Sequence, residues 1–156
     1  MISVAVPGWG ELSLEYLMID FNGTAAVDGK LKKDVKDTLE KLSRYIKIFI
    51  ITADSYDSVD AEMTATTVTA IKVNKNSSGE EKAKVVRELG PEKVVAIGNG
   101  SNDAAMMKEA ALGIAVMGDE GCSATLIKEA DLVVTDVTKA LGLIMHPERI
   151  LATLRD

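Results

Sequence analysis

The chain has 156 residues, of which 47% are hydrophobic and 4% aromatic, and its formal net charge is −6. This length suffices for one domain, residues 1–156, with its own apolar core. The acidic balance and the lack of a basic run argue against nucleic-acid binding, and no apolar run approaches the ~20 residues that span a bilayer. The single cysteine, Cys122, excludes an internal disulfide and fits a reducing compartment, so we expect a soluble cytoplasmic protein without membrane contact.

The first fifteen residues predict a β-hairpin. Residues 2–6 form a short apolar-rich strand, residues 7–10 (Pro-Gly-Trp-Gly) form a turn, and the chain returns through Leu12 and Leu14. We expect Trp9 to hold this hairpin against the body of the protein.

An apolar run then leads directly into a carboxylate. Residues 16–19 precede Asp20, and Gly23 and Thr24 follow within a turn. A short apolar run bounded by turn residues is typical of a buried strand in a parallel sheet. Because functional groups of such sheets gather beyond the carboxyl ends of the strands, Asp20 is either a structural cap or the working group of the protein.

The rest of the chain predicts alternating strands and helices. Residues 25–30 contain the turn signal Asp28-Gly29 and predict a small flap hairpin. A helix follows, because four apolar residues recur at helical spacing: Leu31, Val35, Leu39 and Leu42. Further strands are predicted at 46–51, 67–73, 94–97, 113–116 and 132–134, and further helices at 58–65, 80–89 and 104–110 and after residues 123, 136 and 147. This order predicts an α/β fold with a doubly wound, parallel, Rossmann-like sheet.

Polar residues follow three of these strands and would meet in one crevice. They are Asp20, Asn22 and Thr24 after the first strand, Thr52 after the second, and Asn99 and Asp103 after the third. Lys82 lies in the helix that precedes the third strand. Phosphoryl transfer needs such a set: a carboxylate nucleophile, oxygen ligands for a hard cation, and a hydroxyl and an ammonium for the phosphoryl oxygens.

With these residues in this order, the chain resembles the haloacid dehalogenase (HAD) superfamily of phosphohydrolases, and within it the phosphorylation domain of P-type ATPases. Four motifs carry the resemblance: Asp20-Phe21-Asn22-Gly23-Thr24, Thr52-Ala53-Asp54, Lys82 within residues 81–89, and residues 98–107 continuing into 110–116. They occur in family order and span residues 16 to about 135. The resemblance implies a HAD-type fold.

The resemblance also implies a role for each motif residue. Asp20 would be the nucleophile that becomes an aspartyl-phosphate, and Thr52 and Lys82 would hold the transferring phosphoryl oxygens. Ala53 and Gly23 would lie in the phosphate-binding turns.

A metal site is implied as well. Magnesium would be held by the carboxylate of Asp20, the backbone carbonyl of Asn22 and the side chain of Asn99, with Asp103 beside them. A water-rich site of oxygen ligands suits Mg²⁺.

Two residues depart from the family pattern. Phosphatases of the family usually carry a second aspartate, the general acid and base, where this chain has Asn22, and their fourth motif has an aspartate where this chain has Asn99. General acid–base help is worth roughly 10²–10⁴ in rate, and an amide cannot shuttle a proton. We therefore expect a phosphohydrolase that is slow to dephosphorylate; the alternative is a non-catalytic regulatory module that keeps the fold and binds Mg²⁺ and phosphate weakly.

Three assignments have alternatives. Thr52 could be a helix-entry cap, and Asp103 could be a cap for residues 104–110. Lys84 is a rival to Lys82, although the family spacing favours Lys82.

The chain has no room for a cap domain, because residues 25–51 hold a flap and one helix, and residues 53–81 hold one helix and one strand. A nucleotide-binding domain does not fit either, so ATP is not the expected substrate despite the resemblance to P-type ATPases, and we expect a phosphorylated small molecule or a phosphoprotein. Capless members act on large substrates or close their site with a neighbouring subunit, which leaves open a homo-oligomer through the flap or the Trp9 hairpin.

Overall fold

The protein is described from a computed structural model, which covers residues 1–53, 58–64 and 66–156. Six strands form one parallel sheet in the order β10-β9-β8-β3-β6-β7. They are β3 (Tyr16–Asp20), β6 (Lys47–Thr52), β7 (Thr69–Lys72), β8 (Val94–Gly98), β9 (Leu112–Val116) and β10 (Leu132–Val134). The predicted doubly wound parallel sheet is confirmed, and the described residues contain no separate cap domain.

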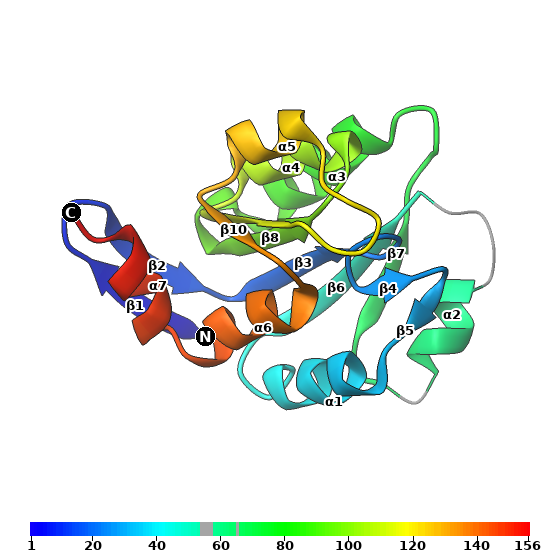
Figure 1. The fold of residues 1–156 in the computed structure, drawn as a ribbon, viewed down its shortest axis with the longest axis horizontal. Coiled ribbons are helices and arrows are strands. Elements are labelled where there is room, and N and C mark those ends of the chain that lie inside the picture. Colours follow the sequence, from blue (N-terminus) through cyan, green and yellow to red (C-terminus); the bar gives the residue numbers. More distant parts are fainter. Residues whose placement is uncertain (54–57, 65) are drawn as a thin grey trace.

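Helices cover both faces of this sheet (Figure 1). One face carries α3 (Ser78–Leu89), α4 (Ala104–Glu109) and α5 (Ala124–Glu129), and the other carries α1 (Lys33–Leu42) and α6 (Val137–Met145). The short helix α2 (Ser58–Met63) lies near the edge strand β7, and α7 (Glu148–Leu154) lies beside the N-terminal strands. Among the described residues, no helix has both the length and the apolar character needed to cross a membrane.

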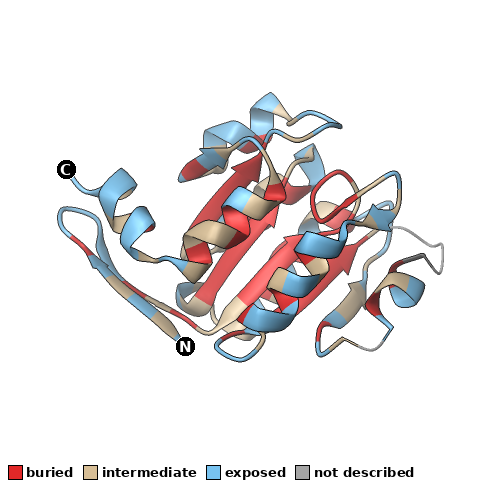
Figure 2. Cartoon of the chain, turned by 60° about the horizontal axis from the view of Figure 1, so that its bottom comes forward, coloured by how far each residue is buried: buried red, intermediate tan, exposed pale blue. Residues whose placement is uncertain are grey.

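The central strand β3 contributes to two cores. Leu17 and Ile19 pack in the cluster that includes α1 and α6, whereas Met18 packs with residues of α3, α4 and α5. All three are fully buried, because successive side chains of a strand point to opposite faces and both faces are covered. Figure 2 shows the sheet strands as the most buried layer of the molecule.

Two small hairpins form where they were predicted. They are β1 (Ile2–Val6) with β2 (Gly10–Leu14), and β4 (Ala26–Val27) with β5 (Lys30–Leu31). At the tip of the flap, Asp28 and Gly29 have φ of 51° and 73°. Two successive positive φ angles are typical of the tight hairpin turn that Asp-Gly favours.

Three predictions are wrong in detail. Leu31 pairs with Ala26 in the flap, so it ends β5 and α1 begins only at Lys33. The helix α3 begins at Ser78, two residues before the predicted start at 80. Trp9 is 40% exposed and does not hold the hairpin down.

The hairpin is instead attached to the body by the apolar side of β2. Leu12 and Leu14 are buried and belong to the larger core cluster. The other predicted strands and helices agree with the structure to within one or two residues at each end, except that the predicted helix end at Ala65 lies outside the described residues.

The strand register places the site. Asp20 pairs with Ile51, and Ile19 pairs with Ile97, so β3, β6 and β8 end at the same level. The residues that follow these strands therefore share one edge of the sheet.

Candidate active site

A buried lysine lies between two carboxylates at this edge. The ammonium Nζ of Lys82 donates to Oδ1 of Asp20 and to Oδ1 of Asp103, both at 2.6 Å. Lys82 and Asp103 are fully buried, and Asp20 is 6% exposed. We refer to these three residues as the buried triad.

The amphipathic pattern of α3 aims Lys82 at the site. Its buried residues Ser78, Lys82 and Val86 recur every four positions and therefore face the sheet. Lys84 lies on the outer face, where its ammonium is 3.8 Å from the carboxylate of Glu88. Lys82, and not its rival Lys84, thus reaches Asp20.

Asp103 is anchored on its second oxygen as well. Oδ2 accepts hydrogen bonds from the backbone amides of Asn99, at 3.1 Å, and Gly100, at 3.0 Å. A Cβ on Gly98 would lie 2.6 Å from Cγ of Asp103, so glycine is needed for the carboxylate to reach back over its own loop. Among the described residues, the side chain of Asp103 makes no capping hydrogen bond to α4, so the alternative role as a cap for residues 104–110 is not found.

The charges of the triad do not cancel. Burial raises the pKa of Asp20 and the neighbouring charge of Asp103 raises it further; Lys82 opposes both, and the result is about 7. Burial alone would lower the pKa of the Lys82 ammonium, but the two carboxylates outweigh burial and raise it. With all three groups ionised, two negative charges therefore face one positive charge.

A threonine hydroxyl links Asp20 to the loop after β8. Oγ1 of Thr24 lies 3.0 Å from Oδ1 of Asn99 and 3.4 Å from Oδ2 of Asp20. The amide nitrogen of Asn99 points the other way and donates to the carbonyl of Gly121 at 3.2 Å. The Thr24 hydroxyl thus lies within hydrogen-bond distance of both the amide oxygen of Asn99 and the second oxygen of Asp20.

Gly23 makes this close approach feasible. Its φ is +78°, and a Cβ there would lie 2.5 Å from Nδ2 of Asn99 and 3.0 Å from Oε2 of Glu120. The chain after Asp20 consequently forms a cradle that any larger residue would fill.

The donor set around this cradle fits a hard divalent cation. No three His, Cys, Asp or Glu side chains gather as a metal site in the described part of the chain. The available donors are instead the carboxylate of Asp20 and the amide oxygen of Asn99, to which the resemblance adds the backbone carbonyl of Asn22, and all of these are oxygens. The surplus negative charge of the buried triad is a second reason why a cation fits here.

An open cleft of about 460 Å³ lies over the triad. Its lining consists of Asp20, Asn22, Thr52, Ala53, Lys75, Asn99, Gly100 and Asn102. Five of the predicted site residues are therefore brought together at the cleft, with Lys82 and Asp103 directly beneath Asp20. Asp54 of the second motif lies outside the described residues.

Three lining residues were not among the predicted site residues: Lys75, Gly100 and Asn102. Lys75 belongs to the polar loop between β7 and α3, and only its position just before the helix of Lys82 could have drawn attention to it. Asn102 lies inside the fourth motif and contacts α3 through Oγ of Ser78, at 3.4 Å.

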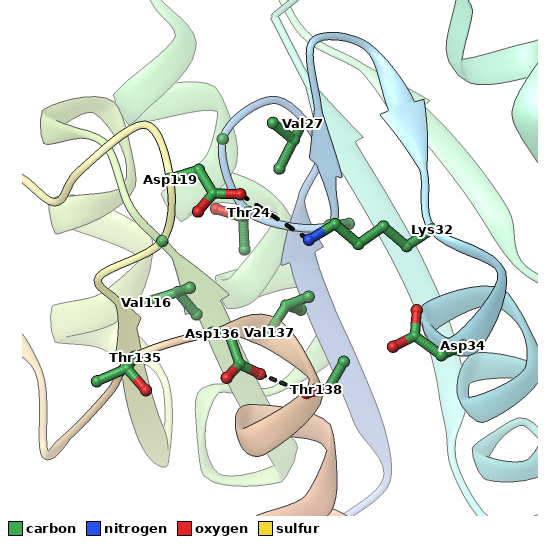
Figure 3. A pocket seen from close by; sticks show the side chains of 13 residues that line it. Thr24, Val27, Lys32, Asp34, Val116, Asp119, Thr135, Asp136, Val137 and Thr138 are labelled. Carbon is green, nitrogen blue, oxygen red and sulfur yellow. Dashed lines mark hydrogen bonds and ion pairs between the residues drawn. The ribbon is translucent and has the colours of Figure 1, made fainter.

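A second cavity, of about 220 Å³, lies on the other side of the Gly23 turn (Figure 3). It is lined by the flap, the loop after β9 and the start of α6, and Lys32 faces Asp119 across it at 3.9 Å. Neither Asp20 nor Lys82 lines this cavity. The candidate active site is therefore the cleft over the triad.

Comparison with known proteins gives a family and a fold. A family model described as a haloacid dehalogenase-like hydrolase matches residues 4–111. An uncharacterized protein of Methanocaldococcus jannaschii is 43% identical over 93 residues, which are 55% of this chain and all of that protein.

Two crystal structures of 3-deoxy-D-manno-octulosonate 8-phosphate phosphatase have a similar fold. The Moraxella catarrhalis enzyme, in complex with magnesium, phosphate and KDO, has a TM-score of 0.71 at 18% identity and covers 89% of this chain and 90% of its own. The Yersinia pestis enzyme has a TM-score of 0.70 at 17% identity and covers 96% of this chain and 95% of its own. At these identities the likeness shows the fold alone; the finer resemblance to P-type ATPases stays a prediction.

The raised pKa of Asp20 predicts how stability depends on pH in the metal-free protein. The folded state binds the proton of the Asp20 carboxyl group more tightly than the unfolded chain, where the pKa of this group is 3.8. The Asp20 carboxyl group therefore lowers the free energy of unfolding as pH rises from about 4 to about 7. Asp20→Asn removes this pH-dependent loss of stability, because an amide does not titrate. In EDTA, the variant should have a higher Tm than the wild type at pH 8, and the difference should shrink toward pH 5.

Asp103→Asn is the matched control for this prediction. Its amide nitrogen would have to face either Lys82 or the two backbone amides, all of which are donors, so the variant should lose stability at both pH values. An Asp20→Asn variant that melts below the wild type at pH 8 would contradict the proton linkage.

The cradle at Gly23 predicts a second stability difference. Gly23→Ala and Gly29→Ala impose similar backbone strain, because φ is +78° and +73°, but nothing lies within 4 Å of a Cβ on Gly29. Urea unfolding should show a loss for Gly23→Ala that is about 1–3 kcal/mol larger, because only this Cβ collides with Asn99. Equal losses for the two variants would mean that the cradle is not tightly packed.

Proposed function

The chain belongs to the haloacid dehalogenase-like hydrolase family, and from this premise we propose that it is a Mg²⁺-dependent phosphohydrolase that forms an aspartyl-phosphate on Asp20. The observation that carries the proposal is the buried triad beneath an open polar cleft. The magnesium and phosphate in the Moraxella catarrhalis phosphatase, which has the same fold, support this choice of chemistry.

Lys82 stabilises the ionised form of Asp20, which is the form that acts as a nucleophile. One oxygen of Asp20 is held by the ammonium, which favours the ionised carboxylate that must attack phosphorus. Asp103 holds the same ammonium from the other side and fixes its position relative to Asp20. Both carboxylates therefore bind the ammonium of Lys82, but only Asp20 borders the cleft.

In the first half-reaction, an oxygen of Asp20 forms a bond to phosphorus while the bond from phosphorus to the leaving oxygen breaks. The electron pair of the broken bond departs with the leaving group. Thr52 and Ala53 line the cleft beside Asp20, where they would contact the transferring phosphoryl oxygens. Magnesium, when bound by Asp20, Asn99 and the carbonyl of Asn22, would neutralise part of the phosphoryl charge.

Asn22 restricts both steps. It lines the cleft where a general acid would be needed, and its amide cannot give a proton to the leaving group or take one from water. Substrates whose leaving groups depart readily as anions, such as acyl or aryl phosphates, do not need a general acid in the first step. Water attack on the phosphoenzyme still needs a general base, so phospho-Asp20 should accumulate.

The same two amides favour a second candidate function. Asn22 and Asn99 lower the proton-transfer capacity and the negative charge of the site, as would suit a regulatory module that binds Mg²⁺ and phosphate without turnover. The two candidates differ in whether Asp20 becomes phosphorylated.

Incubation with Mg²⁺ and acetyl phosphate tests the proposal. We expect an acid-stable adduct of about 80 Da on the intact protein, located by peptide mapping at Asp20 and absent from Asp20→Asn. Beryllium fluoride should raise the Tm of the wild type but not of Asp20→Asn. Neither adduct nor turnover in the wild type would exclude the enzymatic function and leave the regulatory one.

An aspartate at residue 22 should speed the hydrolysis of the phosphoenzyme. Asn22→Asp should increase the decay rate of the isolated phosphoenzyme by roughly 10²–10⁴, measured by mass spectrometry of quenched samples. Asn76→Asp adds the same charge in an exposed loop and should leave the decay rate unchanged. Unaltered decay in Asn22→Asp would show that residue 22 does not limit dephosphorylation.

A further inference from the structure

Lys75 is the one basic side chain among the described residues that line the cleft. The remaining lining residues are the carboxylate Asp20 and neutral residues: Asn22, Thr52, Ala53, Asn99, Gly100 and Asn102. Lys82 lies beneath Asp20 and does not border the cleft, so Lys75 is the cation that an incoming ligand meets there.

The loop that carries Lys75 is fixed to α3. Glu81 accepts from the backbone amide of Asn74 at 2.8 Å and from the hydroxyl of Ser77 at 2.6 Å, so one carboxylate holds both ends of the loop. The amide of Asn76 donates to the side chain of Asn74 at 2.9 Å and tightens the turn around Lys75.

Glu81 and Lys82 are consecutive residues whose side chains point in opposite directions. Glu81 faces the loop outside the helix, whereas Lys82 points inward to Asp20. The first turns of α3 therefore set the position of the cleft lysine relative to the nucleophile.

The ammonium of Lys75 has no protein partner among the described residues, unlike other lysines nearby. Lys72 pairs with Asp60 at 2.6 Å, and Lys84 approaches Glu88 at 3.8 Å. A lysine at a cleft wall whose charge is not satisfied by a neighbouring carboxylate is available to a ligand anion.

A phosphate attacked by Asp20 must have its leaving group directed away from the triad, toward the open side of the cleft. Lys75 is exposed and lines that cleft, where it can reach a group on the departing part of the substrate. Its charge is not required for the chemistry at Asp20, because Lys82 already serves that carboxylate.

We propose that Lys75 is a specificity-determining residue that binds a second anionic group on the leaving-group side of the substrate. The substrate class is then a small aryl or acyl phosphate whose leaving group carries a carboxylate or a second phosphate. This inference rests on the proposed phosphohydrolase activity, because it concerns the same cleft.

Two aryl phosphates of nearly equal shape test the inference: 4-carboxyphenyl phosphate and the neutral 4-carbamoylphenyl phosphate. The wild type should favour the carboxylate in kcat/KM by roughly two- to fivefold, the effect of one ion pair at an exposed position. The kcat values should be equal, because the aryl group departs before water attacks phospho-Asp20. 1,4-Phenylene bisphosphate, whose leaving group carries the second phosphate, is tested alongside and shows whether a second phosphate is preferred to a carboxylate.

Substitutions at residue 75 test whether Lys75 causes the preference for the carboxylate ester. Lys75→Met should abolish it, Lys75→Glu should reverse it, and Lys75→Arg should retain it. Lys84→Met removes an exposed lysine from the outer face of α3 and should leave the preference unchanged. A preference that persists in Lys75→Met, or equal kcat/KM for both esters in the wild type, overturns the inference but not the phosphohydrolase activity.

Failure of the proposed function is recognised separately. If the wild type neither turns over either ester nor forms a phospho-Asp20 adduct, both the proposed activity and the role of Lys75 are rejected.

Discussion

The ammonium of Lys82 is removed from water and shared by two carboxylates, and much of the site follows from that arrangement. A buried charge costs several kcal/mol unless its partners are placed with good geometry. Here the placement requires α3 to present Lys82 toward the sheet and requires glycine at residue 98 for the approach of Asp103. The position of the nucleophile is thus fixed by groups that do not themselves border the cleft.

The triad is also left with one negative charge too many, which gives the site its chemistry. Burial raises the pKa of Asp20, and the nearby charge of Asp103 raises it further; the surplus negative charge also favours a cation beside Asp20. An aspartate at residue 99 would add to this excess, whereas the amide present supplies an oxygen without a charge. The two asparagines therefore leave the site with less negative charge than two aspartates would and reduce its capacity for proton transfer.

Much of the site could be predicted because its residues lie in short motifs directly after strands. The apolar run before Asp20 indicated a buried parallel strand, and parallel strands of similar length end at one edge. Lys75 could not be found in this way, since it lies in a loop without a motif and reaches the cleft only through the attachment of that loop to Glu81. Trp9 was misjudged because an aromatic residue in a turn packs only if the hairpin lies flat on the body, and here Leu12 and Leu14 make that contact.

The sequence alone determined the class of fold, the order of the strands along the chain and the residues that could carry phosphoryl chemistry, because hydrophobic periodicity and turn residues act locally. Only the tertiary structure decided which oxygens remain for a cation or a phosphate. Both oxygens of Asp103 are used by Lys82 and by two backbone amides, whereas the second oxygen of Asp20 lies only 3.4 Å from the hydroxyl of Thr24, which itself lies 3.0 Å from the amide oxygen of Asn99. Such a division of hydrogen bonds depends on contacts between residues up to 75 positions apart, which no local pattern encodes.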